Sequence, residues 1–290
     1  MKCIVCKKKK FNVIWNNKIR SSANNFTKKN EKVLQCLNCQ LVFLKNKRKK
    51  FENSAISRNI YNKNNSIKEF KKFHTPREMK KLNFIKKKIN LKNKKILESN
   101  CGAGILINNL KRNAKLTAGL DSDFYKDFVE KNGHLFISSI DEIIKKKNSF
   151  DIILSFSELE HKYDPVYFLK KLKLILNKKG KIILRIPNFY NIYMYLLDYH
   201  FFKYDFRTSH NYYFSKKNLE IMFNKIGFNI IYSSGMNEYS FNHLLNYIKL
   251  KERVKNRKII KFLSNKDDNY AVKNLEKNWS STSLIYILSN

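Results

Sequence analysis

The chain has 290 residues, and its 60 Lys and Arg against 23 Asp and Glu give a formal charge of +37. Hydrophobic residues make up 43% of the sequence, enough for a sizeable core, so a wholly disordered chain is excluded. No apolar stretch reaches the roughly 18 residues of a membrane-spanning helix, and the N-terminus has no apolar segment typical of a secretory signal. We therefore expect a cytoplasmic protein whose five cysteines are reduced, metal-bound or catalytic rather than disulfide-linked.

The positive charge is unevenly distributed along the chain. Residues 1–95 carry a net charge of +25, which is most of the excess. The sequence also contains 51 Lys, 38 Asn and 31 Ile, which have AT-rich codons, and a coding bias of this kind can produce much of the lysine excess. The total charge is therefore weak evidence for a nucleic-acid partner, whereas its asymmetry indicates two structural units.

A cysteine-containing segment comes first in the chain, and an α/β pattern follows it. Residues 45–75 are polar and lysine-rich and indicate a linker. Thr75 and Pro76 predict the start of a helix, because Thr is a favoured N-cap and Pro a favoured first helical residue. Beyond these residues, short apolar runs predict strands at Lys95–Glu98, Leu116–Leu120, Leu135–Ile137, Asp151–Ser155, Lys181–Ile186, Phe228–Tyr232 and Ser283–Leu288.

The stretches between these runs predict helices at Ile105–Arg112, Ser122–Lys131, Asp141–Lys146, Asp164–Leu176 and Ser215–Ile226. Gly180 is expected to close the fourth of these helices. Residues 236–280 give no clear pattern beyond a helix over Leu244–Lys251. Strands that alternate with helices predict a parallel sheet covered on both faces.

Four of the five cysteines form two matched pairs, Cys3-x-x-Cys6 and Cys36-x-x-Cys39. Two such pairs place four thiolates within reach of one tetrahedral ion, and Zn²⁺ favours this closed, structural kind of site. A region this small needs a metal to fold, because its own core is thin. Two clustered pairs without a thioredoxin-like pattern argue against a redox motif. We predict a structural zinc bound by Cys3, Cys6, Cys36 and Cys39.

A loop of small residues follows the first predicted strand of the α/β region. Gly102 and Gly104 let the backbone approach a ligand closely, and the next helix directs its free N–H groups and positive dipole end at that ligand. Asp121 ends the next strand, where an acidic side chain can accept hydrogen bonds from both hydroxyls of a ribose. The pattern favours a nucleoside-containing cofactor. A dinucleotide fits less well, because the third glycine of its motif is absent.

The loop from Glu98 to Gly104, ESNCGAG, resembles the first motif of class I S-adenosylmethionine-dependent methyltransferases. Asn100 stands where the family has its first glycine, and Asn is the next most tolerant residue of a positive φ. The resemblance implies that this loop holds the methionine part of S-adenosylmethionine and that Asp121 holds its ribose. The cofactor-binding residues inferred from it are Glu98, Asn100, Cys101, Gly102, Gly104, Asp121 and Ser155.

A longer match covers later strands of the same family. It includes Leu159-Glu160-His161, Asp164-Pro165, Pro187-Asn188 and His210–Ser215, so the resemblance extends over about residues 76–235. The cysteine pairs extend it to a subgroup with an N-terminal zinc ribbon, several members of which methylate sugars or sugar nucleotides.

The resemblance implies an α/β fold with a Rossmann-like, seven-stranded, mostly parallel sheet, helices on both faces, and a small zinc-ribbon domain before it. The implied domains are a zinc ribbon over 1–44, a basic linker over 45–75 and a methyltransferase domain over 76–290. The core of that last domain covers about 90–235, and a C-terminal extension of helix and strand covers 236–290.

Methyl transfer from a sulfonium needs a general base only where the acceptor keeps its proton near neutral pH. His161 is the first candidate, because it follows the fourth strand at the carboxyl edge where ligands bind such sheets. The alternative is that His161 only braces its loop. His210 is the second candidate. Ser157 stands where related metal-dependent enzymes have a ligand glutamate, so we expect no catalytic metal.

Three functions follow from these observations. The first is a methyltransferase for a small molecule, such as a sugar, nucleotide sugar or glycan precursor. The second is an RNA methyltransferase whose basic ribbon contacts phosphates. The third is a non-enzymatic interaction protein with a degenerate site, which the replacement of the motif's first glycine by Asn100 suggests. The basic first third is also compatible with contact to an anionic membrane surface.

Overall fold

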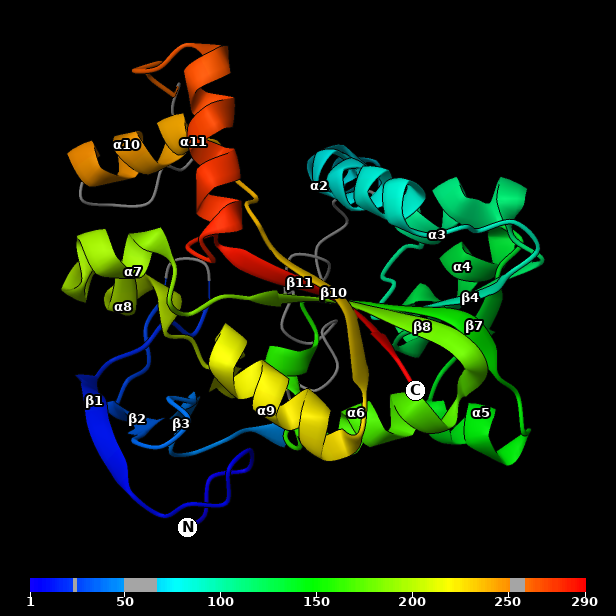
Figure 1. Ribbon diagram of the computed structural model, residues 1–290, viewed down its shortest axis with the longest axis horizontal. Coiled ribbons are helices and arrows are strands. Elements are labelled where there is room, and N and C mark those ends of the chain that lie inside the picture. The colour runs from blue at the N-terminus through cyan, green and yellow to red at the C-terminus, as the bar shows by residue number, and fades with distance from the viewer. Residues whose placement is uncertain (23–24, 50–66, 251–258) are drawn as a thin grey trace.

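The computed structural model describes residues 1–22, 25–49, 67–250 and 259–290 (Figure 1). Within these residues a seven-stranded sheet has the order β10-β11-β8-β7-β4-β5-β6, and a four-stranded sheet has the order β1-β2-β3-β9. The strands of the larger sheet are β4 (Lys95–Ser99), β5 (Leu116–Leu120), β6 (Leu135–Ile137), β7 (Phe150–Phe156), β8 (Leu176–Pro187), β10 (Asn229–Met236) and β11 (Ser283–Ser289).

The larger sheet is parallel over most of its width and antiparallel at one edge. Strand β4 pairs in parallel with β5 and β7, β5 pairs in parallel with β6, and β7 pairs in parallel with β8. Strand β11 pairs antiparallel with both β8 and β10. The predicted Rossmann-like, seven-stranded and mostly parallel sheet is therefore confirmed.

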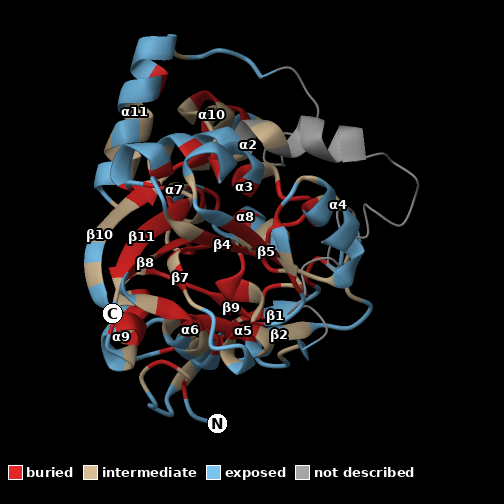
Figure 2. Ribbon diagram, turned by 90° about the vertical axis from the view of Figure 1, so that its right-hand side faces the viewer, coloured by how far each residue is buried: buried red, intermediate tan, exposed pale blue. Residues whose placement is uncertain are grey.

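Helices cover both faces of this sheet, and buried residues are concentrated in its strands (Figure 2). The flanking helices are α2 (Ile67–Lys88), α3 (Ile105–Leu110), α4 (Lys126–Lys131), α5 (Ile140–Lys145), α6 (Pro165–Leu174) and α9 (Lys216–Ile226). Successive residues of a strand point to opposite faces, as β4 illustrates. Ile96 packs with Leu82 of α2 and Leu106 of α3, whereas Leu97 belongs to the cluster that contains Leu169 of α6.

The smaller sheet joins two distant parts of the chain. Its first three strands, β1 (Phe11–Asn17), β2 (Glu31–Cys36) and β3 (Val42–Leu44), come from the cysteine-containing segment, whereas β9 (Tyr212–Tyr213) comes from the α/β region. In the antiparallel β3–β9 pair, Val42 lies opposite Tyr213 and Phe43 lies opposite Tyr212. We call residues 1–49 the ribbon segment.

Among the described residues, four further helices lie outside the sheet layers: α7 (Ile192–Leu197), α8 (Tyr199–Asp205), α10 (Phe241–Leu250) and α11 (Asn265–Lys277). Trp15 and Leu44 of the ribbon segment share a buried cluster with Leu197 of α7, Phe201 of α8 and Leu244 of α10. The helix predicted over 244–251 corresponds to α10, although residue 251 lies outside the described residues. None of the helices in the described parts of the chain has the length and hydropathy needed to span a bilayer.

The predicted start of one helix is wrong. Helix α2 begins at Ile67, so Thr75 and Pro76 lie within it. The eight residues from Ile67 to His74 contain neither Gly nor Pro and include Lys and Glu, which favour helix, so the helix extends back through the Thr-Pro signal. Residues 50–66 of the predicted linker lie outside the described residues.

The predicted role of Gly180 is also wrong. Helix α6 ends at Leu174, and Gly180 lies inside β8. The pairing of β8 with β7 shifts register between Phe150 and Ile152, which is where the glycine-containing part of β8 bulges. A Cβ atom on Gly180 would lie 2.7 Å from the Leu176 side chain, so the bulge requires glycine.

Candidate active site and metal centre

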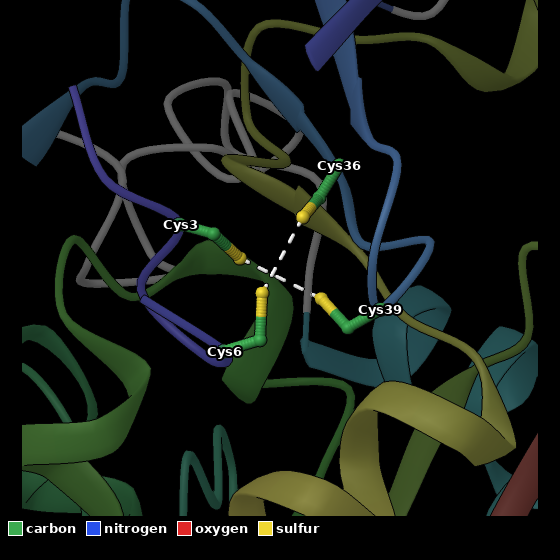
Figure 3. Close-up of side chains that lie close together, drawn as sticks. All are labelled: Cys3, Cys6, Cys36 and Cys39. Atoms are coloured by element: carbon green, nitrogen blue, oxygen red, sulfur yellow. Dashed lines mark hydrogen bonds between the residues drawn. The ribbon is translucent and has the colours of Figure 1, made fainter. Parts of the chain in front are cut away.

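The four paired cysteines come together in the ribbon segment (Figure 3). Their sulfurs lie within 4.8 Å of one another, and the Sγ atoms of Cys3 and Cys39 and of Cys6 and Cys36 are 3.6 and 3.5 Å apart. Four thiolates at about 2.3 Å from a tetrahedral zinc ion stand about 3.8 Å apart. The geometry and chemistry of this donor set therefore fit Zn²⁺.

The two cysteine pairs share one backbone form. The Lys7 N–H donates to the Cys3 carbonyl and the Gln40 N–H donates to the Cys36 carbonyl, both at 2.9 Å. Lys7 and Gln40 have φ of 65° and 60°, so each turn closes through a left-handed residue. The hydrogen bond between the Cys39 and Cys3 sulfurs lowers the pKa of Cys3 to about 5 and raises the pKa of Cys39, so the two thiols share one proton that a bound metal would displace.

The loop after β4 has the backbone conformation that a close-approaching ligand requires. Asn100, Gly102 and Gly104 have φ of 64°, 54° and 69°, all in the left-handed region. The Asn100 N–H donates to the Leu120 carbonyl at 2.8 Å, which attaches the loop to the end of β5. Asn tolerates this conformation better than most residues do, so the loop forms with Asn100 in the place of the family's first glycine.

Asp121, at the end of β5, lies against this loop. Its Oδ2 accepts a hydrogen bond from the Gly102 N–H and its Oδ1 accepts one from the Ser122 N–H, both at 2.8 Å. Asn100 and Asp121 line a cleft of about 430 Å³ at the carboxyl ends of the parallel strands. This volume is in the range of small-ligand sites, and the carboxyl edge is where such sheets bind ligands.

Glu98 and Cys101 are buried residues that are absent from the lining of this cleft. Burial raises the pKa of Glu98 well above its ordinary value, and the nearby Ile107 N–H of α3 offsets part of that rise. Burial also raises the pKa of the Cys101 thiol well above its ordinary value, and a Cβ on Gly119 would lie 2.6 Å from its sulfur. The Glu98 and Cys101 side chains therefore pack in the interior beneath the loop rather than in the cleft.

Glu158 is a cleft residue that sequence reasoning did not select. Its Oε1 accepts hydrogen bonds from Ser99 Oγ and Lys162 Nζ, both at 2.9 Å, and its Oε2 accepts one at 2.6 Å from the predicted site residue Ser155. A buried carboxylate held in this way can face a cationic group of a ligand. Its position beside the Leu159-Glu160-His161 motif was the signal available in the sequence.

The two candidate histidines lie side by side with a buried glutamate. Glu160 and His161 belong to the short 3₁₀ helix Leu159–His161 after β7, and His210 comes from the segment before β9. The rings of His161 and His210 meet edge to face with centroids 4.8 Å apart. His161 Nδ1 is 2.6 Å from the Ser209 carbonyl oxygen. Because a carbonyl only accepts, Nδ1 carries the proton and Nε2 of the neutral ring is the acceptor.

Burial sets the electrostatics of this group, which we call the histidine cluster (Glu160, His161 and His210). It raises the pKa of Glu160 to about 7. Burial, and then the Arg207 and His161 charges, lower the pKa of His210 well below its ordinary value. Near neutral pH the cluster therefore contains a partly protonated carboxyl and a neutral imidazole, which suits proton transfer.

The ligand atoms of the histidine cluster lie within 4.8 Å of one another, a spacing from which a divalent cation can be bound. The expectation that the site uses no catalytic metal rests on Ser157 and stays a prediction. The roles assigned to individual cofactor and catalytic residues are likewise predictions.

A family model described as a methyltransferase domain matches residues 70–233, which is more than half of the chain. The chain belongs to this family. The match contains the Asn100 loop, Asp121 and the histidine cluster, and it ends within β10. The resemblance to class I S-adenosylmethionine-dependent methyltransferases is thereby confirmed, and the four-cysteine cluster is compatible with a zinc ribbon.

Two relatives similar in sequence to this chain are transferases named for different acceptors. A tRNA U34 carboxymethyltransferase of Nautilia profundicola is 32% identical over 113 residues, which is 36% of this chain and 38% of the relative. A ubiquinone biosynthesis O-methyltransferase of Coxiella burnetii is 28% identical over 116 residues, which is 37% of this chain and 50% of the relative. The chain thus matches half or less of the length of these relatives.

A solved structure with similar architecture is a chain of the complex between the Haloferax volcanii Trm112 methyltransferase activator and a methyltransferase. It is 13% identical, with a TM-score of 0.53, and the alignment covers 84% of this chain and 99% of that one. At this identity the likeness shows the fold alone.

Proposed function

We propose that the chain transfers a methyl group from S-adenosylmethionine to a small-molecule acceptor, namely a sugar, nucleotide sugar or glycan precursor. The observation that carries the proposal is a cluster able to transfer protons, Glu160, His161 and His210. Its Glu160–His161 turn follows β7 at the carboxyl ends of the parallel strands, where the Asn100–Asp121 cleft also lies, although the cluster's three residues are outside the lining of that cleft. A general base at this place suits acceptors that keep their proton, such as a hydroxyl. The order of four-cysteine ribbon and methyltransferase domain supports the sugar class.

The cleft has the features that this cofactor requires. Asn100 and Asp121 line the cleft, and Asp121 offers a carboxylate to the ribose hydroxyls. Gly102 and Gly104 are buried and outside the lining, and their left-handed conformation sets the course of the loop against which the methionine part would lie. Glu158 supplies a second carboxylate in the same cleft for a cationic group. When bound, S-adenosylmethionine supplies a methyl group already activated on a sulfonium.

The acceptor's proton goes to His161. The Ser209 carbonyl holds the proton on Nδ1, so Nε2 is the nitrogen that accepts a proton as the acceptor atom gains its methyl group. Glu160 Oε1 lies 3.9 Å from His161 Nε2 and stabilises the imidazolium that results. The His210 ring supports His161 edge to face. Glu160 and His210 are buried and His161 is half-buried, which limits the access of water to the reacting groups.

Cys3, Cys6, Cys36 and Cys39 hold the proposed zinc in a structural role. Four thiolates fill a tetrahedral coordination shell, so no position is open for substrate. The metal therefore stabilises the ribbon segment rather than taking part in methyl transfer.

The proposal is tested by incubating the purified, zinc-loaded chain with methyl-labelled S-adenosylmethionine and nucleotide-sugar fractions. We expect label in a sugar-containing product, and its loss in His161→Gln. Cofactor binding without transfer to any sugar fraction would remove the sugar class. Absence of cofactor binding by calorimetry would remove the methyltransferase activity itself.

A second candidate function is RNA methylation. It is favoured by the net charge of +25 over residues 1–95 and by the relative named as a tRNA U34 carboxymethyltransferase. Retention of total RNA that weakens steeply between about 50 and 200 mM salt is the expected signature, because phosphate contacts release counterions. No retention at about 50 mM salt excludes this function.

A further inference from the structure

The ribbon segment is attached to the backbone that carries the histidine cluster. Strand β3 pairs with β9, and the Leu44 N–H donates at 3.0 Å to the carbonyl of Asn211, the residue before β9. Their cores are also continuous, because Cys36 and Phe43 belong to the same buried cluster as Leu159 and Tyr212. The ribbon segment therefore packs on the proposed acceptor side of the methyltransferase domain through buried side chains as well as through the β3–β9 pair.

Asn211 is the residue through which these contacts converge. Its side chain is fully buried and contacts Arg48, near the end of the ribbon segment, both as a donor and as an acceptor. Asn211 Oδ1 accepts a hydrogen bond from the Arg48 N–H at 2.8 Å, and Asn211 Nδ2 donates to the Arg48 carbonyl at 3.0 Å. One amide thus pairs with both polar groups of a single backbone residue, which fixes its position and orientation.

The same residue also fixes the catalytic turn. The Asn211 N–H donates to the Glu160 carbonyl at 2.8 Å, and Nδ2 donates to the His161 carbonyl at 2.9 Å. Ser209, two residues before Asn211, provides the carbonyl that holds the proton of His161 Nδ1. His210, which lies between them, contacts the His161 ring. Both the backbone of His161 and its proton partner are therefore placed by one short segment.

We propose that Asn211 is a positioning residue that couples the four-cysteine ribbon to His161. A folded ribbon holds β3 and Arg48 in place, and these contacts fix Asn211. Asn211 in turn fixes the Glu160–His161 turn and the tautomer of His161. The ribbon is then part of the acceptor site rather than a separate stabilising cap. The inference rests on the proposed function for its catalytic meaning, although the coupling itself is a property of the fold.

A purely stabilising role for Asn211 is the competing explanation, and Asn218 provides the matched control. Asn218 is also fully buried, and its side chain forms two hydrogen bonds with Ser215 at the start of α9. Neither bond involves the ribbon or the histidine cluster. Replacing either asparagine by alanine removes a buried amide, but only Asn211→Ala breaks the connection to His161.

The test follows the imidazole nitrogens of the zinc-loaded full chain by ¹⁵N NMR. The chain has six histidines, and His161→Gln assigns the signal of His161. In the wild type we expect the Nδ1–H form of His161. In Asn211→Ala with zinc still bound we expect a mixture of tautomers, while the dissociation constant for S-adenosylmethionine changes by less than about threefold, because the cofactor loop is a separate contact region.

A second arm removes the metal from the wild type with a chelator and should reproduce the His161 change. Asn211→Ser replaces Asn211→Ala if the latter fails to fold, and the chelation arm decides if both fail. An unchanged His161 signal after loss of the amide or of the metal overturns the inference, as does an equal change in Asn218→Ala. Absence of cofactor binding overturns the proposed function instead and leaves the NMR result to be interpreted by itself.

Discussion

The proposed cofactor side and the proposed acceptor side of the site are built in different ways. The cofactor cleft comes from a contiguous loop and the next strand, since Asn100, Gly102 and Asp121 lie within 22 residues. The acceptor side depends on contacts between Arg48, Asn211 and the Glu160–His161 turn, which are far apart in the sequence. A local motif thus specifies one half, whereas assembly of the ribbon on the domain specifies the other.

The largest expected effect is on the free energy of unfolding, and it comes from removing a zinc ligand of the ribbon segment. Cys36→Ser should lose stoichiometric zinc and lower the free energy of unfolding by several kcal/mol, because binding energy at a structural zinc site is folding energy. Denaturation followed by tryptophan fluorescence, which reports Trp15 of the ribbon segment together with Trp279, measures this loss. Cys101→Ala, which lies on the cofactor side, should keep its zinc. Retention of full stability without zinc would contradict the assignment.

A large effect confined to catalysis is expected on the acceptor side. His161→Gln should lower kcat by about 100-fold or more, because a general base contributes that much to proton removal. The dissociation constant for S-adenosylmethionine should change by less than about threefold, since the cleft is lined by other residues. His200→Gln, an exposed histidine on α8, is the control and should leave kcat unchanged. A parallel loss of cofactor binding in His161→Gln would show that the two sides are not separate.

Stability should respond to pH through Glu160. A carboxyl with its pKa raised to about 7 in the folded chain, from an ordinary 4.5, stabilises the fold below pH 4.5 and loses that contribution as pH rises through 7. The wild type should therefore lose about 3 kcal/mol relative to Glu160→Gln across this window. Denaturant unfolding at several pH values measures the difference. Glu130→Gln, at an exposed glutamate of α4, is the control and should follow the wild type. Parallel curves for the wild type and Glu160→Gln would refute the prediction.

The smallest expected effect is on cofactor affinity and concerns Asn100, which replaces the first glycine of the family's loop motif. Asn100→Gly should keep the dissociation constant for S-adenosylmethionine within about threefold, because both residues accept the observed φ of 64°. Asn100→Val should weaken binding by about tenfold or more, because a β-branched residue is strained there. Calorimetry on the two variants decides between them. Equal affinity in both variants would mean that the loop does not need this conformation.

The cofactor half could be predicted because its signals are local. Positive φ at Gly102 and Gly104 follows from residue type, and the place of Asp121 follows from strand order. The acceptor half could not be predicted in the same way. Nothing near Asn211 indicates that its amide will pair with Arg48, because that contact exists only after β3 and β9 meet.

Outside the site, residues 236–280 gave no clear pattern beyond the helix over Leu244–Lys251 because apolar periodicity is missing there. Helix α11 is polar along most of its length, and Asp268 is its buried residue, accepting a hydrogen bond from the Asn242 N–H at 2.6 Å. A helix held by such a bond gives no apolar stripe in the sequence. The early start of α2 was missed for a different reason, because Thr75 and Pro76 indicate a helix start that this helix does not use.

The most direct test of the account is a calorimetric titration of the zinc-loaded chain with S-adenosylmethionine. We predict one binding site in the wild type and binding weaker by about 30-fold or more in Asp121→Ala, because a charged group that hydrogen-bonds a ligand contributes about 2 kcal/mol. Asp123→Asn, an exposed neighbour, should bind as the wild type does. No binding in the wild type, or equal binding in Asp121→Ala, would contradict the placement of the cofactor in this cleft.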